Sequence, residues 1–216
     1  MRKKHKKPER GLVLCFDGPS AAGKDHVVRY LLRRHPEWVF VPRYTTRPLK
    51  PGERNGVDYH FVAPAEFARL KKTGRLKGVH HFDGNWYGVD VREIDRHLGA
   101  KKRRTVVGIF GRCSPAVREE FGKRVGKRAV LFFITASPAV LAERLRERGE
   151  LTEGQFHTRL GNAARHISEA QGKFDYVVST DPDARPPPLF IEAVLHSLEI
   201  KLGIKVAGLD FNNNDD

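Results

Sequence analysis

One short segment points to the architecture of this chain: Gly18-Pro19-Ser20-Ala21-Ala22-Gly23-Lys24-Asp25. An apolar run at residues 12–16 precedes it, and residues 27–32 have the apolar spacing of a helix. A strand, a glycine-containing loop and a helix in this order predict a P-loop, where backbone N–H groups and the Lys24 ammonium contact anionic oxygens. The alternative is a plain glycine turn, which does not require this spacing of glycines and lysine.

Length and composition favour one domain, with room for a small inserted subdomain, because the chain has 216 residues and 39% of them are hydrophobic. A formal net charge of +14 points to anionic partners, and nucleotides, sugar phosphates and nucleic acid all fit it. The only two cysteines, Cys15 and Cys113, argue against a disulfide framework and favour a reducing, cytoplasmic setting. No apolar segment is long enough to span a membrane, so no membrane partner is expected.

The two ends of the chain are expected to lie outside the folded domain. Residues 1–10 form a basic run that repels itself, so we expect a disordered arm. This arm could contact RNA weakly, or it could be a solvated tail. It lacks the apolar region of a secretory signal. Residues 204–216 are expected to form a tail that ends in polar residues, which leaves residues 11–203 as the domain.

Several local patterns predict strands and helices. Residues 129–134 form a near-continuous apolar run, which is typical of a buried parallel strand. Ser137-Pro138 combines an N-cap residue with a proline at the first helical position, and Thr152-x-x-Gln155 resembles a capping box. Residues 89–97 are expected to form a helix that ends at Gly99.

Residues 43–61 combine many turn residues with four cations and two tyrosines. A regular surface loop does not need this combination. A phosphate pocket does, because arginine offers a planar fork of donors and tyrosine a directed hydroxyl. The segment therefore predicts a phosphate pocket.

Within this segment the chain resembles the guanylate kinase family. Its signature is matched position by position at Thr45-Thr46-Arg47, Lys50, Glu53, Gly56 and Tyr59-His60-Phe61. The resemblance continues through residues 64–67 and 84–88, resumes at 141–149 and reaches 174–178. It implies a P-loop NTPase fold of the three-layer α/β class with a parallel core sheet. It also implies an acceptor-binding subdomain at about 43–89 and a helical lid at about 144–170.

The resemblance implies ATP bound together with Mg²⁺ on the P-loop. The expected ATP-binding residues are Gly18, Ser20, Ala21, Ala22, Gly23, Lys24, Asp25 and His26. Asp25 stands where a serine or threonine hydroxyl usually follows the lysine and binds Mg²⁺. We predict that the Asp25 carboxylate takes over as the metal ligand.

By the same resemblance, four residues hold the phosphate of the acceptor: Arg47, Lys50, Tyr59 and Tyr87. Most family members have arginine at position 50, so lysine keeps the charge but loses the bidentate fork. For the two tyrosines, packing at strand ends is the alternative interpretation.

The catalytic residues implied by the resemblance are Lys24 and three arginines of the lid: Arg144, Arg148 and Arg159. Such arginines close over the transferring phosphoryl group and spread its charge. A solvated basic helix face is the alternative, because glutamates lie nearby in the sequence.

The positions that would recognise guanine differ from the family. Gly78 stands about where the family has an acid, and Arg43 and Val89 replace small hydroxyl residues. Residues 108–113 contain no carboxylate, although the family has acidic residues there. Glycine cannot accept hydrogen bonds through a side chain, so these differences point to an acceptor other than GMP.

The sequence therefore predicts an ATP-dependent phosphotransferase that acts on a phosphorylated small molecule, with GMP as the family default. An alternative acceptor is a sugar phosphate. Lys24-Asp25, Arg159-Leu160 and Ala163-Ala164-Arg165-His166 also resemble ribose 1,5-bisphosphate phosphokinases. A third interpretation is a non-catalytic guanylate kinase-like module that binds protein or RNA.

Overall fold

The structure is a computed structural model, and it describes residues 9–99, 104–111, 115–121, 125–147, 149, 151–206 and 209. Several predictions fall outside these ranges. The catalytic role of Arg148 is one of them, and the RNA contact of the basic arm is another, since residues 1–8 of that ten-residue arm lie outside the described ranges. Cys113 also lies outside the described residues.

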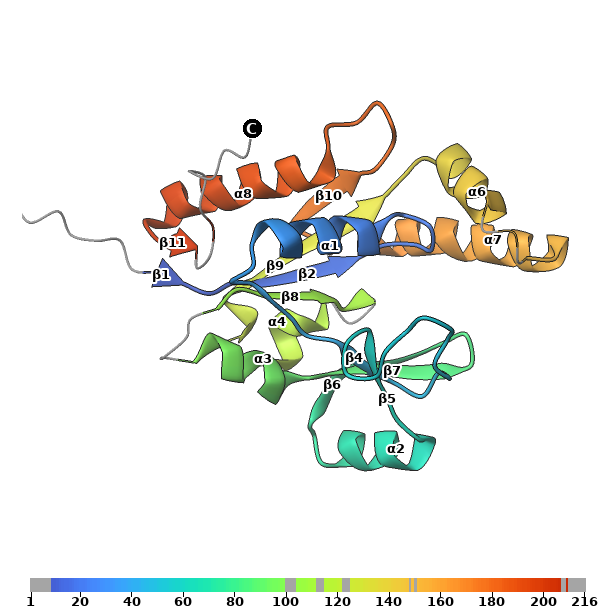
Figure 1. The fold of residues 1–216 in the computed structure, drawn as a ribbon, viewed down its shortest axis with the longest axis horizontal. Coiled ribbons are helices and arrows are strands. Elements are labelled where there is room, and N and C mark those ends of the chain that lie inside the picture. The colour runs from blue at the N-terminus through green and yellow to red at the C-terminus, as the bar shows by residue number, and fades with distance from the viewer. Residues whose placement is uncertain are drawn as a thin grey trace, which may run out of the picture.

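A five-stranded parallel sheet forms the centre of the molecule, in the order β10-β9-β2-β8-β3 (Figure 1). Its strands are β2 (Val13–Asp17), β3 (Val39–Phe40), β8 (Val106–Ile109), β9 (Ala129–Thr135) and β10 (Tyr176–Ser179). β9 is buried along nearly its whole length, as its apolar run predicts. The predicted parallel core sheet is confirmed.

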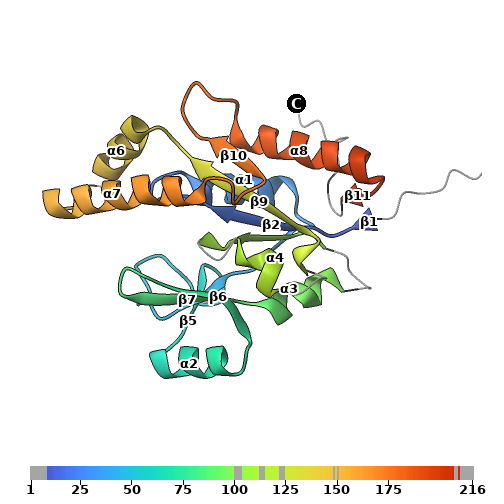
Figure 2. The same cartoon turned by 180° about the vertical axis from the view of Figure 1, so that it is seen from behind.

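Helices cover both faces of this sheet, which makes the fold three-layered (Figure 1, Figure 2). The helices are α1 (Lys24–Arg34) and α8 (Pro187–Leu202) on one face, and α3 (Val91–Leu98) and α4 (Ala116–Glu120) on the other. Successive side chains of β2 point to opposite faces of the sheet, so they contribute to two separate apolar clusters. Leu14 and Phe16 pack into one apolar cluster with residues of α1 and α8, while Val13 and Cys15 pack into a second with residues of α3.

A second, four-stranded sheet lies beside the central one, in the order β5-β4-β7-β6. Its strands are β4 (Arg43–Thr45), β5 (Tyr59–Phe61), β6 (Leu76–Phe82) and β7 (Asn85–Asp90). Helix α2 (Pro64–Lys72) packs against this sheet. Phe67, Leu70 and Leu76 form its small apolar core.

The helix predicted from residue 89 begins two residues later than expected. Val89 belongs to β7, and α3 starts at Val91 because the Asp90 side chain caps it. Asp90 Oδ1 accepts a hydrogen bond from Arg92 N at 2.9 Å. The end of α3 at Gly99 agrees with the prediction.

Two further helices, α6 (Pro138–Glu147) and α7 (Glu153–Ala170), extend from the carboxyl end of the central sheet (Figure 1). We call them the lid helices. The predicted starts of both are confirmed. Ser137 Oγ accepts a hydrogen bond from Val140 N at 3.4 Å, and Thr152 and Gln155 form a complete capping box.

Two short strands correct the expected boundaries of the domain. β1 (Glu9–Arg10) pairs in parallel with β11 (Lys205–Val206), so parts of the expected arm and tail belong to the folded structure. The pair forms because the chain buries apolar side chains here, at Ile204, Val206 and Leu209. Across the described residues, no helix combines the length and apolar character needed to cross a membrane.

Candidate active site

The P-loop connects β2 to α1, and its backbone requires glycine at two positions. Gly18 has a φ of 146°, and a Cβ built on it would lie 1.9 Å from the Ile134 carbonyl oxygen. Gly23 is the N-cap of α1 with a φ of 79°. Glycine adopts such angles at a much lower cost than a residue with a Cβ. The loop therefore passes close to β9 and presents the N-terminus of α1 to an anion.

The Lys24 side chain folds back over this loop. Its Nζ donates hydrogen bonds to Gly18 O at 2.8 Å and to Pro19 O at 2.6 Å. Ser20, Asp25 and His26 are exposed, while Ala21 and Ala22 are buried. The predicted ATP-binding residues therefore occupy one loop and the first turn of one helix. Their binding of ATP stays a prediction.

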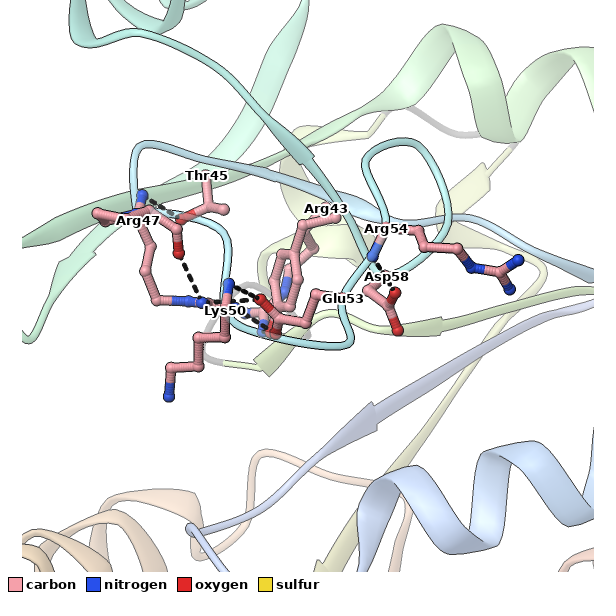
Figure 3. Close-up of polar contacts among 9 residues, drawn as sticks. Arg43, Thr45, Arg47, Lys50, Glu53, Arg54 and Asp58 are labelled. Carbon is pink, nitrogen blue, oxygen red and sulfur yellow. Dashed lines mark hydrogen bonds and ion pairs between the residues drawn. The ribbon is translucent and has the colours of Figure 1, made fainter. Parts of the chain in front are cut away.

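Arg47 and Glu53 form an ion pair in the turn-rich segment (Figure 3). Arg47 Nη1 and Nη2 donate to the two Glu53 carboxylate oxygens at 3.0 and 2.7 Å. Burial acts against ionisation of both groups, but the Glu53 hydrogen bonds and charge raise the pKa of Arg47 overall. The pKa of Glu53 is lowered, because bonds from Arg47 and from Lys50 N outweigh burial.

Two tyrosines complete the cluster that the resemblance predicts. The Arg47 guanidinium carbon lies 5.1 Å from the centre of the Tyr59 ring, and the Tyr59 and Tyr87 rings are 6.2 Å apart. The structure thus brings Arg47, Tyr59 and Tyr87 together. Lys50 reaches the cluster through its backbone bond to Glu53, while its side chain extends away from that carboxylate (Figure 3).

Arg43, which was not predicted as a site residue, lies in the middle of this cluster. Its Nη2 donates to the Tyr59 hydroxyl at 3.0 Å and its Nη1 to Phe110 O at 3.2 Å. Its guanidinium carbon lies 5.4 and 5.1 Å from the centres of the Tyr59 and Tyr87 rings. These are distances typical of cation–π contacts. The sequence signal was present, since Arg43 opens the cationic segment.

At the end of β8, a bulky side chain at position 108 has no room. A Cβ on Gly108 would lie 2.1 Å from the Phe110 ring, so this buried ring occupies the space that a side chain at position 108 would need. A carboxylate does reach Gly78, but it comes from α4. Gly78 N donates to Glu120 Oε2 at 2.8 Å.

One of the predicted lid arginines contacts the P-loop directly. Arg144 of α6 donates from Nη1 to Ala21 O at 3.4 Å and to Thr180 Oγ1 at 2.8 Å. Its Nη2 donates to Thr180 O at 2.8 Å. Arg159 is half-buried on α7. The catalytic roles of these arginines stay predictions.

Asp17 and His166 form a second pair that was not predicted. Asp17 ends β2, His166 belongs to α7, and the two side chains meet with 3.1 Å between Nε2 and Oδ2. A separation of 149 residues hides such a pair from local patterns.

The candidate magnesium ligand, Asp25, is exposed in the first turn of α1 beside Lys24. Within the described ranges, no group of three or more histidine, cysteine, aspartate or glutamate side chains could hold a metal ion alone. This arrangement suits Mg²⁺ that arrives with a nucleotide, because such an ion needs only one or two carboxylates besides phosphate oxygens and water. A single carboxylate at Asp25 fits that requirement.

A P-loop at the carboxyl end of a parallel sheet, faced by a cluster of arginines and tyrosines, defines a P-loop phosphotransferase. A guanylate kinase family model matches residues 9–183. The chain is 33% identical to the guanylate kinase of Synechococcus sp. (strain JA-3-3Ab) over 172 residues, 80% of this chain and 76% of that protein. It is 31% identical to the guanylate kinase of Nostoc sp. (strain PCC 7120 / SAG 25.82 / UTEX 2576), over 90% and 91% of the two chains. The chain belongs to the guanylate kinase family.

Solved structures agree with this assignment. The guanylate kinase of Anaplasma phagocytophilum matches with a TM-score of 0.63 and 26% identity, over 90% of this chain and 88% of that chain. A gluconokinase of Sinorhizobium meliloti 1021 matches with a TM-score of 0.50 and 18% identity, over 92% and 98% of the chains. The second likeness concerns the fold alone, and together the two structures confirm the predicted α/β fold with a parallel central sheet.

Proposed function

We propose that the protein transfers the γ-phosphoryl group of ATP to a phosphate group on a small-molecule acceptor. The observation that carries this proposal is the meeting of two halves of the site at Gly111. A Cβ built on Gly111 would lie 2.6 Å from Arg43 Nη1 and 3.7 Å from Asp17 Oδ1. Arg43 belongs to the tyrosine cluster, and Asp17 directly precedes the P-loop. A donor phosphate on the loop would therefore lie next to an acceptor phosphate in the cluster.

Phosphoryl transfer between two phosphates demands positioning and positive charge more than covalent help from the protein. An oxygen of the acceptor phosphate forms the new bond to the γ-phosphorus, and the bond from that phosphorus to the β–γ bridging oxygen breaks, which releases ADP. In this account the P-loop amides and Lys24 hold the ATP phosphates. Mg²⁺, held by Asp25 and the phosphates, would neutralise charge on the donor.

The remaining site residues divide into those that hold the acceptor phosphate and those that contact the transferring γ-phosphoryl group. Arg47, Lys50, Tyr59 and Tyr87 hold the acceptor phosphate. The charge that spreads over the γ-phosphoryl oxygens in the transition state is stabilised by the lid arginines, Arg144, Arg148 and Arg159. The hydrogen bond from Arg144 to the P-loop carbonyl of Ala21 supports this role.

GMP is the first acceptor to consider, because the named relatives are guanylate kinases. Arg43 favours a second candidate. Its guanidinium adds a cation beside the two tyrosines, which suits an acceptor that carries a second phosphate. Ribose 1,5-bisphosphate is such a molecule. Val89, fully buried in the apolar core, offers a polar base no partner.

A coupled assay of ADP release tests the proposal, with GMP, the other nucleoside monophosphates and ribose 1,5-bisphosphate offered in turn. We expect acceptor-dependent turnover with at least one of them. A Lys24→Met variant should lose at least about a hundredfold in kcat, because the loop cation is gone. If no acceptor supports turnover and ATP does not raise the melting temperature, the protein is a binding module and not a kinase.

A further inference from the structure

Asp17 is a buried carboxylate at the point where β2 becomes the P-loop. Its side chain is 3% exposed, and its Oδ1 accepts a hydrogen bond from Gly18 N at 2.7 Å. A buried carboxylate with unsatisfied oxygens is costly, so its other oxygen needs a partner from elsewhere in the fold. The partner of this second oxygen identifies the element of the fold that Asp17 contacts.

That partner is His166, on lid helix α7. Its Nε2 lies 3.1 Å from Asp17 Oδ2, and the tautomer with its proton on Nε2 donates that proton to this carboxylate oxygen. The imidazole also meets the Phe133 ring edge-on, with 5.4 Å between centroids. Phe133 of β9 is the register partner of Asp17 on β2. Two adjacent residues of the central sheet therefore hold one side chain of the lid helix.

This contact helps to hold α7 beside the P-loop, together with the buried side chains of Phe156 and Ala163 on the same helix. His166 and Arg159 are seven residues apart, so they lie on the same side of the helix about 10 Å apart along its axis. A helix held at one residue in both translation and rotation has its next two turns placed as well. The contact between His166 and Asp17 therefore contributes directly to the placement of Arg159.

We propose that Asp17 and His166 are a positioning pair that places Arg159 over the phosphates bound at the P-loop. The inference rests on the proposed phosphotransfer and adds to it two residues that do not touch the reacting atoms. The pair acts through α7: Asp17 fixes the imidazole, the imidazole fixes the helix, and the helix carries the arginine.

Steady-state kinetics of variants test this role. In His166→Leu we expect kcat to fall by about tenfold or more, because Arg159 no longer stabilises the charge of the transition state. KM for the acceptor should be nearly unchanged, because the acceptor contacts remain. His166→Gln keeps an N–H donor and should recover most of kcat. In an Arg159→Ala background, His166→Leu should lower kcat by less than about twofold further, since both changes remove the same contribution.

His157 provides a matched control on the same helix. It pairs with Glu153 at 3.6 Å, but both side chains are exposed and this pair does not include the P-loop. We expect His157→Leu to leave kcat within about twofold of the wild type, because exposed pairs contribute little.

Hydrogen exchange of α7, with a non-hydrolysable ATP analogue and Mg²⁺ bound, gives a readout independent of turnover. His166→Leu and Asp17→Asn should each speed exchange in α7 by about tenfold, and His157→Leu should not. Unchanged kcat in His166→Leu overturns the proposal, and so does a fall in kcat without faster exchange. If the wild type phosphorylates no acceptor, the proposed function fails, but exchange still decides whether the pair anchors α7.

Discussion

Arg43 donates a hydrogen bond from Nη2 to the hydroxyl of Tyr59 at 3.0 Å. The hydroxyl oxygen accepts this bond, so its own proton is free to point at another group. An anionic acceptor is the group that the neighbouring cations would attract. In the proposed function, Arg43 would thereby leave the Tyr59 hydroxyl proton to donate to the acceptor phosphate.

Replacing Arg43 by methionine should raise KM for the acceptor by about tenfold or more, because a charge-assisted partner of the cluster is lost. KM for ATP should stay nearly unchanged, since ATP is expected on the P-loop. Initial-rate measurements with each substrate varied in turn check this split. Arg54→Met is the control, because Arg54 is exposed in the same segment. An equal rise of both KM values would contradict the assignment.

Gly18→Ala should destabilise the protein by about 3 kcal/mol or more, because the new Cβ would meet the Ile134 carbonyl at a strained φ. The control is Gly161→Ala in α7, where a Cβ meets no atom within 4 Å. Alanine there should stabilise the helix by up to about 1 kcal/mol. Urea denaturation measures both changes. Wild-type stability in Gly18→Ala would show that the loop is placed differently.

The P-loop glycine and the Arg43 contacts differ in how far the sequence alone predicts them. The P-loop is a local pattern that its spacing reveals, and the Arg47–Tyr59 signature is a local pattern that the family resemblance points to. The Arg43 contacts depend on Phe110, which is 67 residues away, and only the fold brings the two together. The pair of Asp17 and His166 is hidden for the same reason.

The chain ends show a related limit. Residues 9–10 end the basic run of residues 1–10, and charge patterning predicts a disordered arm for the whole run. Their strand forms because it pairs with residues 205–206 at the opposite end of the chain. A two-residue strand has no periodicity to detect, and its stability comes from the partner strand and from buried Val206.

Acid should remove the stabilising contribution of the ion pair between Arg47 and Glu53. The pKa of Glu53 is lowered from its ordinary value of 4.5 in the folded protein, so its contribution is complete above that value. It is then lost as the pH falls through the lower folded pKa. The difference in unfolding free energy between wild type and Glu53→Gln should therefore be constant from pH 7 to about 5.5 and shrink below about 4.5. A difference that grew with acid would have the wrong sign.

Asp25→Asn should raise the Mg²⁺ concentration for half-maximal activity by about tenfold, because a neutral amide binds this hard cation more weakly than a carboxylate. Titration of the ATP-bound protein with Mn²⁺, followed by electron paramagnetic resonance, measures the same affinity without turnover. Glu37→Gln, an exposed acid just past the far end of α1, should change neither value. If Asp25→Asn binds Mn²⁺ as tightly as the wild type, another group holds the metal.

Phosphorus NMR of the reaction mixture tests the transfer of a phosphoryl group to an acceptor phosphate most directly. With ATP, Mg²⁺ and the correct acceptor, the acceptor phosphate singlet should disappear and a pair of coupled phosphorus signals of a new phosphoanhydride should appear, in equal amount with ADP. Conversion of ATP to ADP and free phosphate, with the acceptor signal unchanged for GMP and for ribose 1,5-bisphosphate, would contradict this account.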